Sequence, residues 1–182
     1  MMDDITPEEL HNLLIVDGKD GSLVWRARAR DKFPTNRAFN TWNSRYAGNQ
    51  ALNCTSPHGY NIGGIHGKNY RAHRVIWAMV HGEWPDSQLD HINRDKADNR
   101  ISNLRLASNT QNNANRTPLL GSTSKYLGVT WHKLRGKWQA GIVSRTKRTH
   151  LGLFEQEEDA ALAYNFAALE IHGEYANYNK AN

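Results

Sequence analysis

The chain has 182 residues, 38% of them hydrophobic and 23% charged, with a formal net charge of +5. This composition is typical of a folded globular protein, and no apolar run is long enough to cross a membrane. Cys54 is the only cysteine, which excludes an internal disulfide and a cysteine-based zinc site. The acidic N-terminus lacks the layout of a signal peptide, so we expect an intracellular, cytoplasmic protein. The positive charge favours a polyanionic partner.

The first 58 residues predict a helix, two strands and a polar stretch. The motif TPEE at 6–9 is a capping box with proline at the first helical position, which predicts a helix over about 7–14. The stretch LLIVDGKDGSLVWRARA then predicts two strands joined by a turn at 17–21. Residues 30–58 are polar, and we expect them to be irregular.

Alternating arginine and alanine mark the end of the second of these strands. If RARAR continues as a strand, Arg26, Arg28 and Arg30 share one face. A phosphate-contacting strand and a solvated edge strand fit this pattern equally well. We take Arg26 and Arg28 as DNA-binding candidates.

A hairpin and a helix come next. The stretch GYNIGGIHGKNYRAHR predicts a hairpin with its turn near 66–68. In RAHRVIWAMVHG, apolar residues at 72, 75, 76, 79 and 80 have helical spacing, and Gly82 and Pro85 end that helix.

The stretch LDHINRDKADNRISNLRLASNTQNNANR, residues 89–116, predicts a strand, a loop, a second strand and a helix. Asp90 and His91 fall at the end of the first strand, where neighbouring side chains point to opposite faces. The loop NRDKADNR is rich in turn-forming residues, and ISNLRLA is the second strand. Ser108 and Gln111 form a capping box, so a helix begins near residue 109 and carries Asn112.

The spacing of Asp90-His91, Asn103 and Asn112 resembles that of the HNH endonucleases, over about residues 57–116. The resemblance is greatest to the phage and intron-encoded group, in which the last motif residue is asparagine. It implies that Asp90 and Asn112 ligate one divalent metal ion. It also implies that His91 is the general base that activates water, and that Asn103 braces the loop and orients His91.

The chemistry of these side chains agrees with that resemblance. Oxygen ligands such as a carboxylate and an amide suit Mg²⁺ or Mn²⁺ and not zinc, and with so few of them the DNA phosphate must complete the shell. A neutral imidazole with a pKa near ~6.5 can accept a proton from water. Asn109 and Asn113 remain alternatives to Asn112 if the helix register is displaced. In the plainer interpretation, these residues only build turns and cap a helix.

Residues 117–125, TPLLGSTSK, have the composition of a linker, and we place a domain boundary in 117–124. Beyond it, YLGVTWH, KWQAGIV and THLGLF predict three short strands. The stretch EQEEDAALAYNFAALEIHG predicts one amphipathic helix that ends at Gly173.

The second domain, over about residues 124–179, contains the motifs Y-x-G-V, G-K-W-x-A-x-I, L-G-x-F and A-A-x-A-Y in this order. They resemble the Apetala-type (ethylene-response-factor-like) DNA-binding domain. The resemblance implies a three-stranded antiparallel sheet on one helix, with the sheet face in the major groove of DNA. Thr130 and Val143 stand where plant members often have base-reading arginines. The plant sequence preference therefore does not carry over.

Basic side chains interleaved with tryptophans are typical of a phosphate-binding surface, although tryptophans can instead be core and charges merely solvated. We interpret Trp138 as partly core. The DNA-binding candidates are Arg26, Arg28, Arg100, Arg105, Arg116, Trp131, Lys133, Arg135, Lys137, Arg145, Lys147 and Arg148.

Taken together, the sequence predicts an α+β protein. Residues 1–116 would be an HNH (ββα-metal) nuclease domain with a β-rich N-terminal extension and a core at about 87–116. Residues 117–124 would be a linker, and residues 125–182 the Apetala-type domain, a small three-stranded antiparallel sheet packed on one helix.

The expected function is that of a phage or homing HNH endonuclease that uses Mg²⁺ or Mn²⁺ to hydrolyse, and as a monomer to nick, double-stranded DNA. We expect no membrane contact and no small-molecule cofactor. The alternatives are a DNA-binding regulator with an inactive nuclease fold and a structural or RNA-binding protein.

Overall fold

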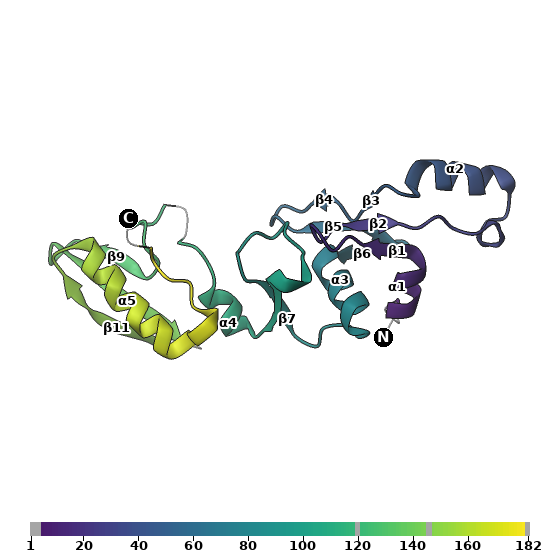
Figure 1. The fold of residues 1–182 in the computed structure, drawn as a ribbon. Coiled ribbons are helices and arrows are strands. Elements are labelled where there is room, and N and C mark those ends of the chain that lie inside the picture. Colours follow the sequence, from purple (N-terminus) through teal and green to yellow (C-terminus); the bar gives the residue numbers. More distant parts are fainter. Residues whose placement is uncertain (1–4, 119–120, 145–146, 181–182) are drawn as a thin grey trace. The chain divides into compact units, whose positions relative to one another are not determined.

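The computed structural model describes residues 5–118, 121–144 and 147–180. Helices and small antiparallel sheets alternate along the chain, so the predicted α+β class is confirmed (Figure 1). The chain divides into two compact units, residues 1–106 and 107–182. We describe the two units separately.

The unit boundary precedes the linker expected at 117–124, of which 119–120 lie outside the described residues. The helix α4 (Asn109–Ala114) belongs to the second unit because it is tied to the C-terminal tail. The backbone N–H of Asn177 donates to the carbonyl oxygen of Ala114 at 3.3 Å. The Asn177 amide Nδ2 donates to the carbonyl oxygen of Arg116 at 2.7 Å.

The first unit begins with the predicted helix and strand pair. Helix α1 (Pro7–Leu13) is capped by the Thr6 hydroxyl oxygen, which accepts a hydrogen bond from the Glu9 backbone at 3.2 Å. Strands β1 (Leu14–Val16) and β2 (Leu23–Trp25) pair antiparallel, and β3 (Gln50–Ala51) extends the sheet in the order β1-β2-β3. These predictions are confirmed.

Between β2 and β3 the expectation of irregular structure is wrong. A short 3-10 turn, η1 (Arg30–Lys32), leads into the helix α2 (Asn36–Tyr46), and Thr35 caps α2 by accepting a hydrogen bond from the Ala38 backbone at 3.1 Å. The sequence NRAFNTWNSRY is polar on average, which hides the helical spacing of Phe39, Trp42 and Tyr46. The proposed strand through RARAR is also wrong, because β2 ends at Trp25.

The hairpin and helix that follow were predicted, but the short strand before them, β4 (Cys54–Thr55), was not. Strands β4, β5 (Asn61–Ile65) and β6 (Lys68–Arg71) form a second antiparallel sheet. The β5–β6 turn has His66 and Gly67 at φ of 49° and 76°, the left-handed values of a tight hairpin turn. Helix α3 (Ala72–His81) ends at Gly82, whose φ is 74°.

The core of the first unit lies where α1 and α3 pack against these two sheets. Burial of its aliphatic side chains removes apolar surface from water and is the main force that holds the unit together. The buried core residues are Ile5, Leu10, Leu13, Leu14, Leu23, Ala51, Leu52, Ile65, Ala72, Val75, Ile76, Ala78 and Met79.

The central motif follows α3 as strand β7 (Gln88–His91), a loop, the 3-10 turn η2 (Ile101–Asn103), strand β8 (Leu104–Ala107) and α4. Strands β7 and β8 pair as a two-stranded sheet. The second strand is shorter than predicted. Ile101 lies in η2 and is 37% exposed, so it does not pack as a strand residue.

The second unit has the predicted three strands and one helix. Strands β9 (Val129–His132), β10 (Lys137–Ser144) and β11 (Lys147–Phe154) form an antiparallel sheet in the order β11-β10-β9. Helix α5 (Glu157–His172) packs on the sheet and is followed by the 3-10 turn η3 (Gly173–Tyr175). None of the helices in the described ranges is long and apolar enough to cross a membrane.

Candidate active site

The candidate site of the first unit is built around the end of strand β7. Asp90 and His91 each retain only 4% of their surface exposed, and Leu89 retains 5%. Two polar side chains are thus buried at the end of one short strand. Buried polar groups require partners, so their neighbours decide what they can do.

Asp90 is held by an arginine from the neighbouring strand β8. The Arg105 guanidinium donates from Nε at 2.9 Å and approaches with Nη2 at 2.8 Å, both to Asp90 Oδ2. The Arg105 side chain is only 14% exposed. Arg105 was predicted to contact DNA. In this structure its charge instead balances the buried carboxylate.

His91 contacts Asn99, an asparagine that was expected only to build the turn. Asn99 is 2% exposed, and its Oδ1 lies 3.2 Å from His91 Nε2. An amide oxygen only accepts hydrogen bonds, so Nε2 carries the proton and the lone pair of the neutral imidazole is on Nδ1. Burial lowers the pKa of His91, more than the Asn99 hydrogen bond and Asp90 raise it. The neutral form is therefore favoured at pH 7.

Two further rings surround His91. The ring of His73, in α3, lies 5.1 Å from that of His91 in an edge-on arrangement, and the ring of Tyr60 lies 5.2 Å from His73 and 5.9 Å from His91. His73 is 3% exposed, and within the described part of the chain its Nδ1 has no hydrogen-bond partner. Burial, followed by the proximity of His91, lowers the pKa of His73 to about 3.

Asn103 ties together the loop that follows β7. Its Nδ2 donates to Asn93 Oδ1 at 3.0 Å and to the Asp98 carbonyl oxygen at 2.8 Å. Its Oδ1 accepts from the Asn93 backbone at 2.9 Å. Asn103 therefore acts on the loop backbone, while Asn99 is the side chain that contacts the His91 ring nitrogen Nε2.

Two cations lie on the Tyr60 ring beside His91. The Arg71 guanidinium carbon is 4.9 Å and the Lys96 ammonium 4.8 Å from the ring centroid. Lys96 also donates to the His58 carbonyl oxygen at 3.0 Å. Neither cation has a carboxylate partner among the residues that the structure describes. Both charges are thus available to an anion near His91.

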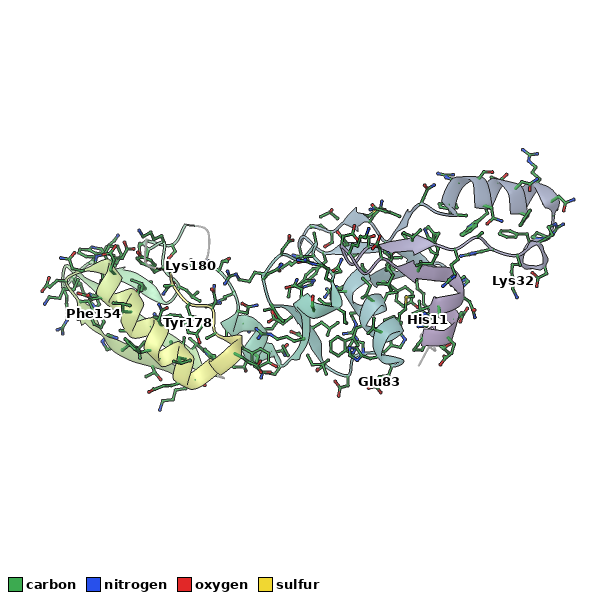
Figure 2. All side chains as sticks on the ribbon, viewed as in Figure 1. His11, Lys32, Glu83, Phe154, Tyr178 and Lys180 are labelled. Carbon is green, nitrogen blue, oxygen red and sulfur yellow. The ribbon has the colours of Figure 1, made fainter. Side chains whose placement is uncertain are left out.

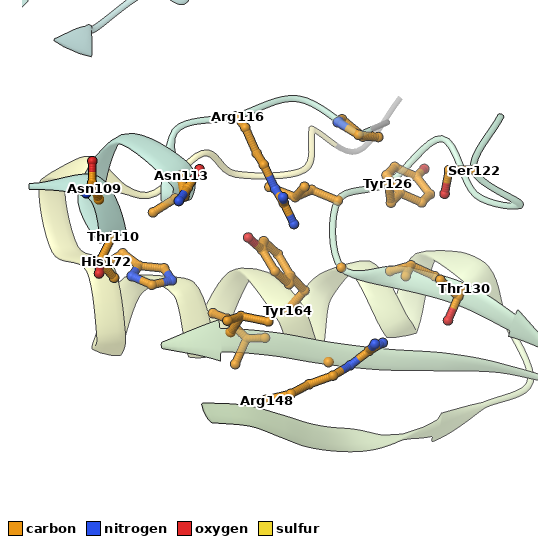
Figure 3. A pocket seen from close by; sticks show the side chains of 18 residues that line it. Asn109, Thr110, Asn113, Arg116, Ser122, Tyr126, Thr130, Arg148, Tyr164 and His172 are labelled. Carbon is orange, nitrogen blue, oxygen red and sulfur yellow. The ribbon is translucent and has the colours of Figure 1, made fainter. Parts of the chain in front are cut away.

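Asn112 lies on α4 in the second unit, so the proposed pairing of Asn112 with Asp90 stays a prediction. The two alternative candidates for this ligand also lie in the second unit. Asn109 and Asn113, one helical turn apart, both line a cavity of about 590 Å³ within the second unit, together with Tyr164 and His172 (Figure 3). Both asparagine side chains are exposed, whereas Asn112 is half-buried. The choice among the three asparagines stays a prediction.

The predicted DNA contacts of the second unit lie on its strands and turns. Trp131 is 39% exposed and packs edge-on against Trp138 with ring centroids 5.0 Å apart, and Lys137 pairs with Glu155 at 2.7 Å. Arg145 lies outside the described residues. The other candidates of this unit are exposed: Arg116, Lys133, Arg135, Lys147 and Arg148.

All four candidates in the first unit, Arg105 included, have contacts within the protein. Arg100 pairs with Asp98 at 2.6 Å, and Arg26 Nε donates to the Leu14 carbonyl oxygen at 3.1 Å. The Arg28 guanidinium lies 4.0 Å from the Trp42 ring centroid. These arginines make contacts within the protein that the sequence did not suggest.

Comparison with known proteins agrees with this geometry. Residues 70–114, which run from β6 to α4, match the family model of the HNH endonucleases. This segment is thus similar to an HNH endonuclease domain. Asp90, His91, Asn103 and Asn112 all lie in this segment. No solved structure matches the chain.

Individual relatives extend beyond that segment. The chain is 33% identical over 127 residues to an uncharacterized HNH endonuclease, L560, of Acanthamoeba polyphaga mimivirus, covering 68% of this chain and 62% of the relative. It is 28% identical over 109 residues to protein 3.8 of Escherichia phage T7, covering 59% of this chain and 89% of the relative. The chain thus spans less than two thirds of the mimivirus protein.

A third relative is of a different kind. Over 52 residues the chain is 48% identical to the AP2-like ethylene-responsive transcription factor PLT2 of Arabidopsis thaliana, which covers 28% of this chain and 9% of the relative. This short match gives weak support to the Apetala-type assignment.

Across the described ranges, no three His, Cys, Asp or Glu side chains gather as a metal site. The proposed ligands Asp90 and Asn112 contribute one carboxylate and one amide, which is a donor set for a hard divalent ion and not for zinc. Such a site needs oxygen atoms from the substrate to be complete.

Proposed function

We propose that the protein is an HNH endonuclease that hydrolyses phosphodiester bonds of double-stranded DNA with the help of a divalent metal ion, Mg²⁺ or Mn²⁺. The observation that carries the proposal is the buried, neutral His91, oriented through Nε2 by Asn99 and placed directly after the buried carboxylate of Asp90. The match of residues 70–114 to the HNH endonucleases supports the same function.

In this reaction His91 is the general base. Its Nδ1 accepts a proton from a water molecule while the water oxygen forms a bond to phosphorus and the bond from phosphorus to the leaving sugar oxygen breaks. Asn99 keeps the proton of the resting imidazole on Nε2 and so directs the lone pair of Nδ1 to the water. Asn103 has an indirect role, since it holds the loop in which Asn93 and Asp98 lie.

Asp90 and Asn112 would hold the metal ion. The Asp90 carboxylate is already positioned by Arg105, so little side-chain freedom is lost when it binds a cation. When bound, the ion would stabilise the negative charge that develops on the phosphate and the leaving oxygen.

Arg71 and Lys96 are suited to hold the phosphate itself. Both lie on the ring of Tyr60, which is 5.9 Å from His91, so a phosphate that they bind is next to the base. A guanidinium and an ammonium form charge-assisted hydrogen bonds with phosphate oxygens. We further propose that the basic strands of the second unit supply DNA affinity. One His91 site acts on one strand at a time, so a monomer nicks duplex DNA.

Cleavage of supercoiled plasmid DNA tests the proposal. The full chain is incubated with plasmids carrying fragments of its source genome, with Mg²⁺, with Mn²⁺ or with EDTA. Wild type should convert supercoiled to nicked DNA in either metal, and EDTA should stop the reaction. His91→Ala should lower the rate at least about 100-fold, as expected for loss of a general base.

His58→Ala is the matched control, because His58 is an exposed histidine of the same unit. It should cut at the wild-type rate. Equal cleavage by wild type and His91→Ala would refute the assigned base. An intact plasmid with every protein, combined with tight DNA binding, would favour a regulator with an inactive nuclease fold.

A further inference from the structure

The positive charge of this protein is concentrated in one segment of the first unit. Residues 26–46 contain one acidic residue, Asp31, and this surplus of basic over acidic residues equals the formal net charge of +5 of the whole chain. Charges of both signs balance over the rest of the molecule. The basic residues of the segment are Arg26, Arg28, Arg30, Lys32, Arg37 and Arg45.

Helix α2 carries the end of this segment and has no buried residue. Its partly buried side chains, such as Phe39 and Trp42, face the protein, whereas Arg37, Thr41 and Arg45 are all exposed. Successive members of this trio are four residues apart, so they form one stripe that is roughly 12 Å long at 1.5 Å per residue. The helix contains no acidic residue. A folded helix with one exposed, purely basic and polar face is suited to bind an anionic surface.

The helix is held by its inner side, which leaves the outer face available. The Arg28 guanidinium lies 4.0 Å from the Trp42 ring centroid and 5.7 Å from that of Trp25. The Asn43 side chain accepts from the Arg28 N–H at 2.9 Å and donates to the Arg28 carbonyl oxygen at 3.0 Å. Arg28 is thus an anchor for α2, and the surface charge rests on other arginines.

Aromatic side chains accompany the exposed arginines. A groove of about 440 Å³ runs beside α2 and is lined by Arg37, Thr41 and Arg45 together with Phe33 and Tyr46. The Arg45 guanidinium carbon lies 5.4 Å from the Tyr46 ring centroid. Figure 2 shows the side chains around this segment, with Lys32 labelled near its start. Arginines interleaved with aromatic rings are typical of nucleic-acid-binding surfaces.

We propose that the outer face of α2 is a duplex-DNA-binding surface, separate from the candidate active site. This inference rests on the proposed function, because it takes the substrate of the nuclease as the partner. An α-helix of about 10–12 Å diameter fits the DNA major groove, which is about 12 Å wide. Arg37 and Arg45 would bind phosphates. The amides and hydroxyls beside them, such as that of Thr41, would hydrogen-bond to the DNA.

The test measures DNA binding by the full chain in EDTA, so that cleavage does not interfere. Binding of a fluorescent duplex is followed by anisotropy over a series of salt concentrations. Arg37→Gln combined with Arg45→Gln should weaken binding about tenfold at low salt. Loss of two phosphate contacts should also reduce the slope of log K against log salt by about 2. Because α2 has no buried residue, the double variant should keep the wild-type melting temperature.

The charge-matched control is Lys19→Gln combined with Lys180→Gln, two exposed lysines outside residues 26–46. It removes the same charge and should change the slope by less than half as much. A double arginine variant that binds like this control or like wild type overturns the inference.

The outcomes for the active site are separate. Wild type that binds DNA but never cuts it contradicts the proposed function. If its affinity still depends on Arg37 and Arg45, the binding surface stands. Wild type that cuts DNA, with an unchanged salt slope in the arginine variant, refutes the surface alone.

Discussion

Replacing His73 with leucine should remove much of the acid sensitivity of this protein. His73 is 3% exposed, its Nδ1 has no partner among the described residues, and its pKa is about 3, whereas an unfolded histidine titrates near ~6.5. Below pH 6.5 the unfolded chain therefore binds a proton at this position and the folded protein does not. Stability is complete above the unfolded pKa and falls as the pH drops toward 3.

The size of the effect follows from the two pKa values. Between about pH 7.5 and about pH 5.5, a histidine that titrates only when unfolded reduces the free energy of unfolding by about 1.4 kcal/mol. His73→Leu should lack this loss. The lowered pKa of His91 adds a decrease in the same direction in both proteins, so the difference between wild type and variant reports on His73.

Urea denaturation followed by circular dichroism at the two pH values measures the loss directly. His58→Leu removes an exposed histidine and should keep the wild-type dependence on pH. If His73→Leu loses as much stability between the two pH values as wild type does, His73 is not a buried neutral histidine, and its proximity to His91 has been misread.

Two pairs of variants test other parts of the structure. Arg105→Met leaves a buried aspartate without its partner and should lower the free energy of unfolding by about 3 kcal/mol, as measured by urea denaturation. Arg100→Met removes an arginine whose side chain is 50% exposed, against 14% for Arg105, and should have a smaller effect. In the second unit, Gly128→Ala requires a φ of 74° and places Cβ 2.1 Å from the Tyr164 ring, so it should cost about 3 kcal/mol. Gly136→Ala, at a φ of 58° in open space, should cost about 1 kcal/mol. Equal losses within either pair would contradict the assigned contacts.

Elements with strong local signals were predictable. The Thr6 cap, the capping box at Ser108, the left-handed Gly82 and the hairpin turn at His66-Gly67 act over a few residues, so the sequence alone specifies them. The three strands and the helix of the second unit were predictable for the same reason, since each has its own periodicity and its own turn residues.

Helix α2 was missed because its sequence is polar on average, although Phe39, Trp42 and Tyr46 have helical spacing. Its position depends on Arg28 packing over Trp42 and on the hydrogen bonds of Asn43, which are contacts between residues that no periodic pattern connects. The arginines of RARAR were assigned to one face of a strand because the sequence does not show these contacts. No strand forms there, and Arg28 packs over Trp42 within the protein.

In the candidate site, too, the residue types were predictable from the sequence, whereas their contacts were not. The identities and spacing of Asp90, His91 and Asn103 are local properties, and the motif alone pointed to hydrolytic chemistry on DNA. What surrounds them depends on the fold. Arg105 reaches Asp90 only because β7 and β8 pair. Asn99 was expected only to form a turn, but the fold of the loop places its side chain in contact with His91.

The sequence by itself predicted most of the elements in their order, though not α2, and the residues that could carry the reaction, because spacing, capping and turn chemistry act along the chain. The tertiary structure decided which nitrogen of His91 is protonated, which arginine balances Asp90, and that His73 and Tyr60 lie beside the base. These features are set by burial and by contacts between distant segments. A pattern of neighbouring residues in the sequence carries no information about burial or about contacts between distant segments.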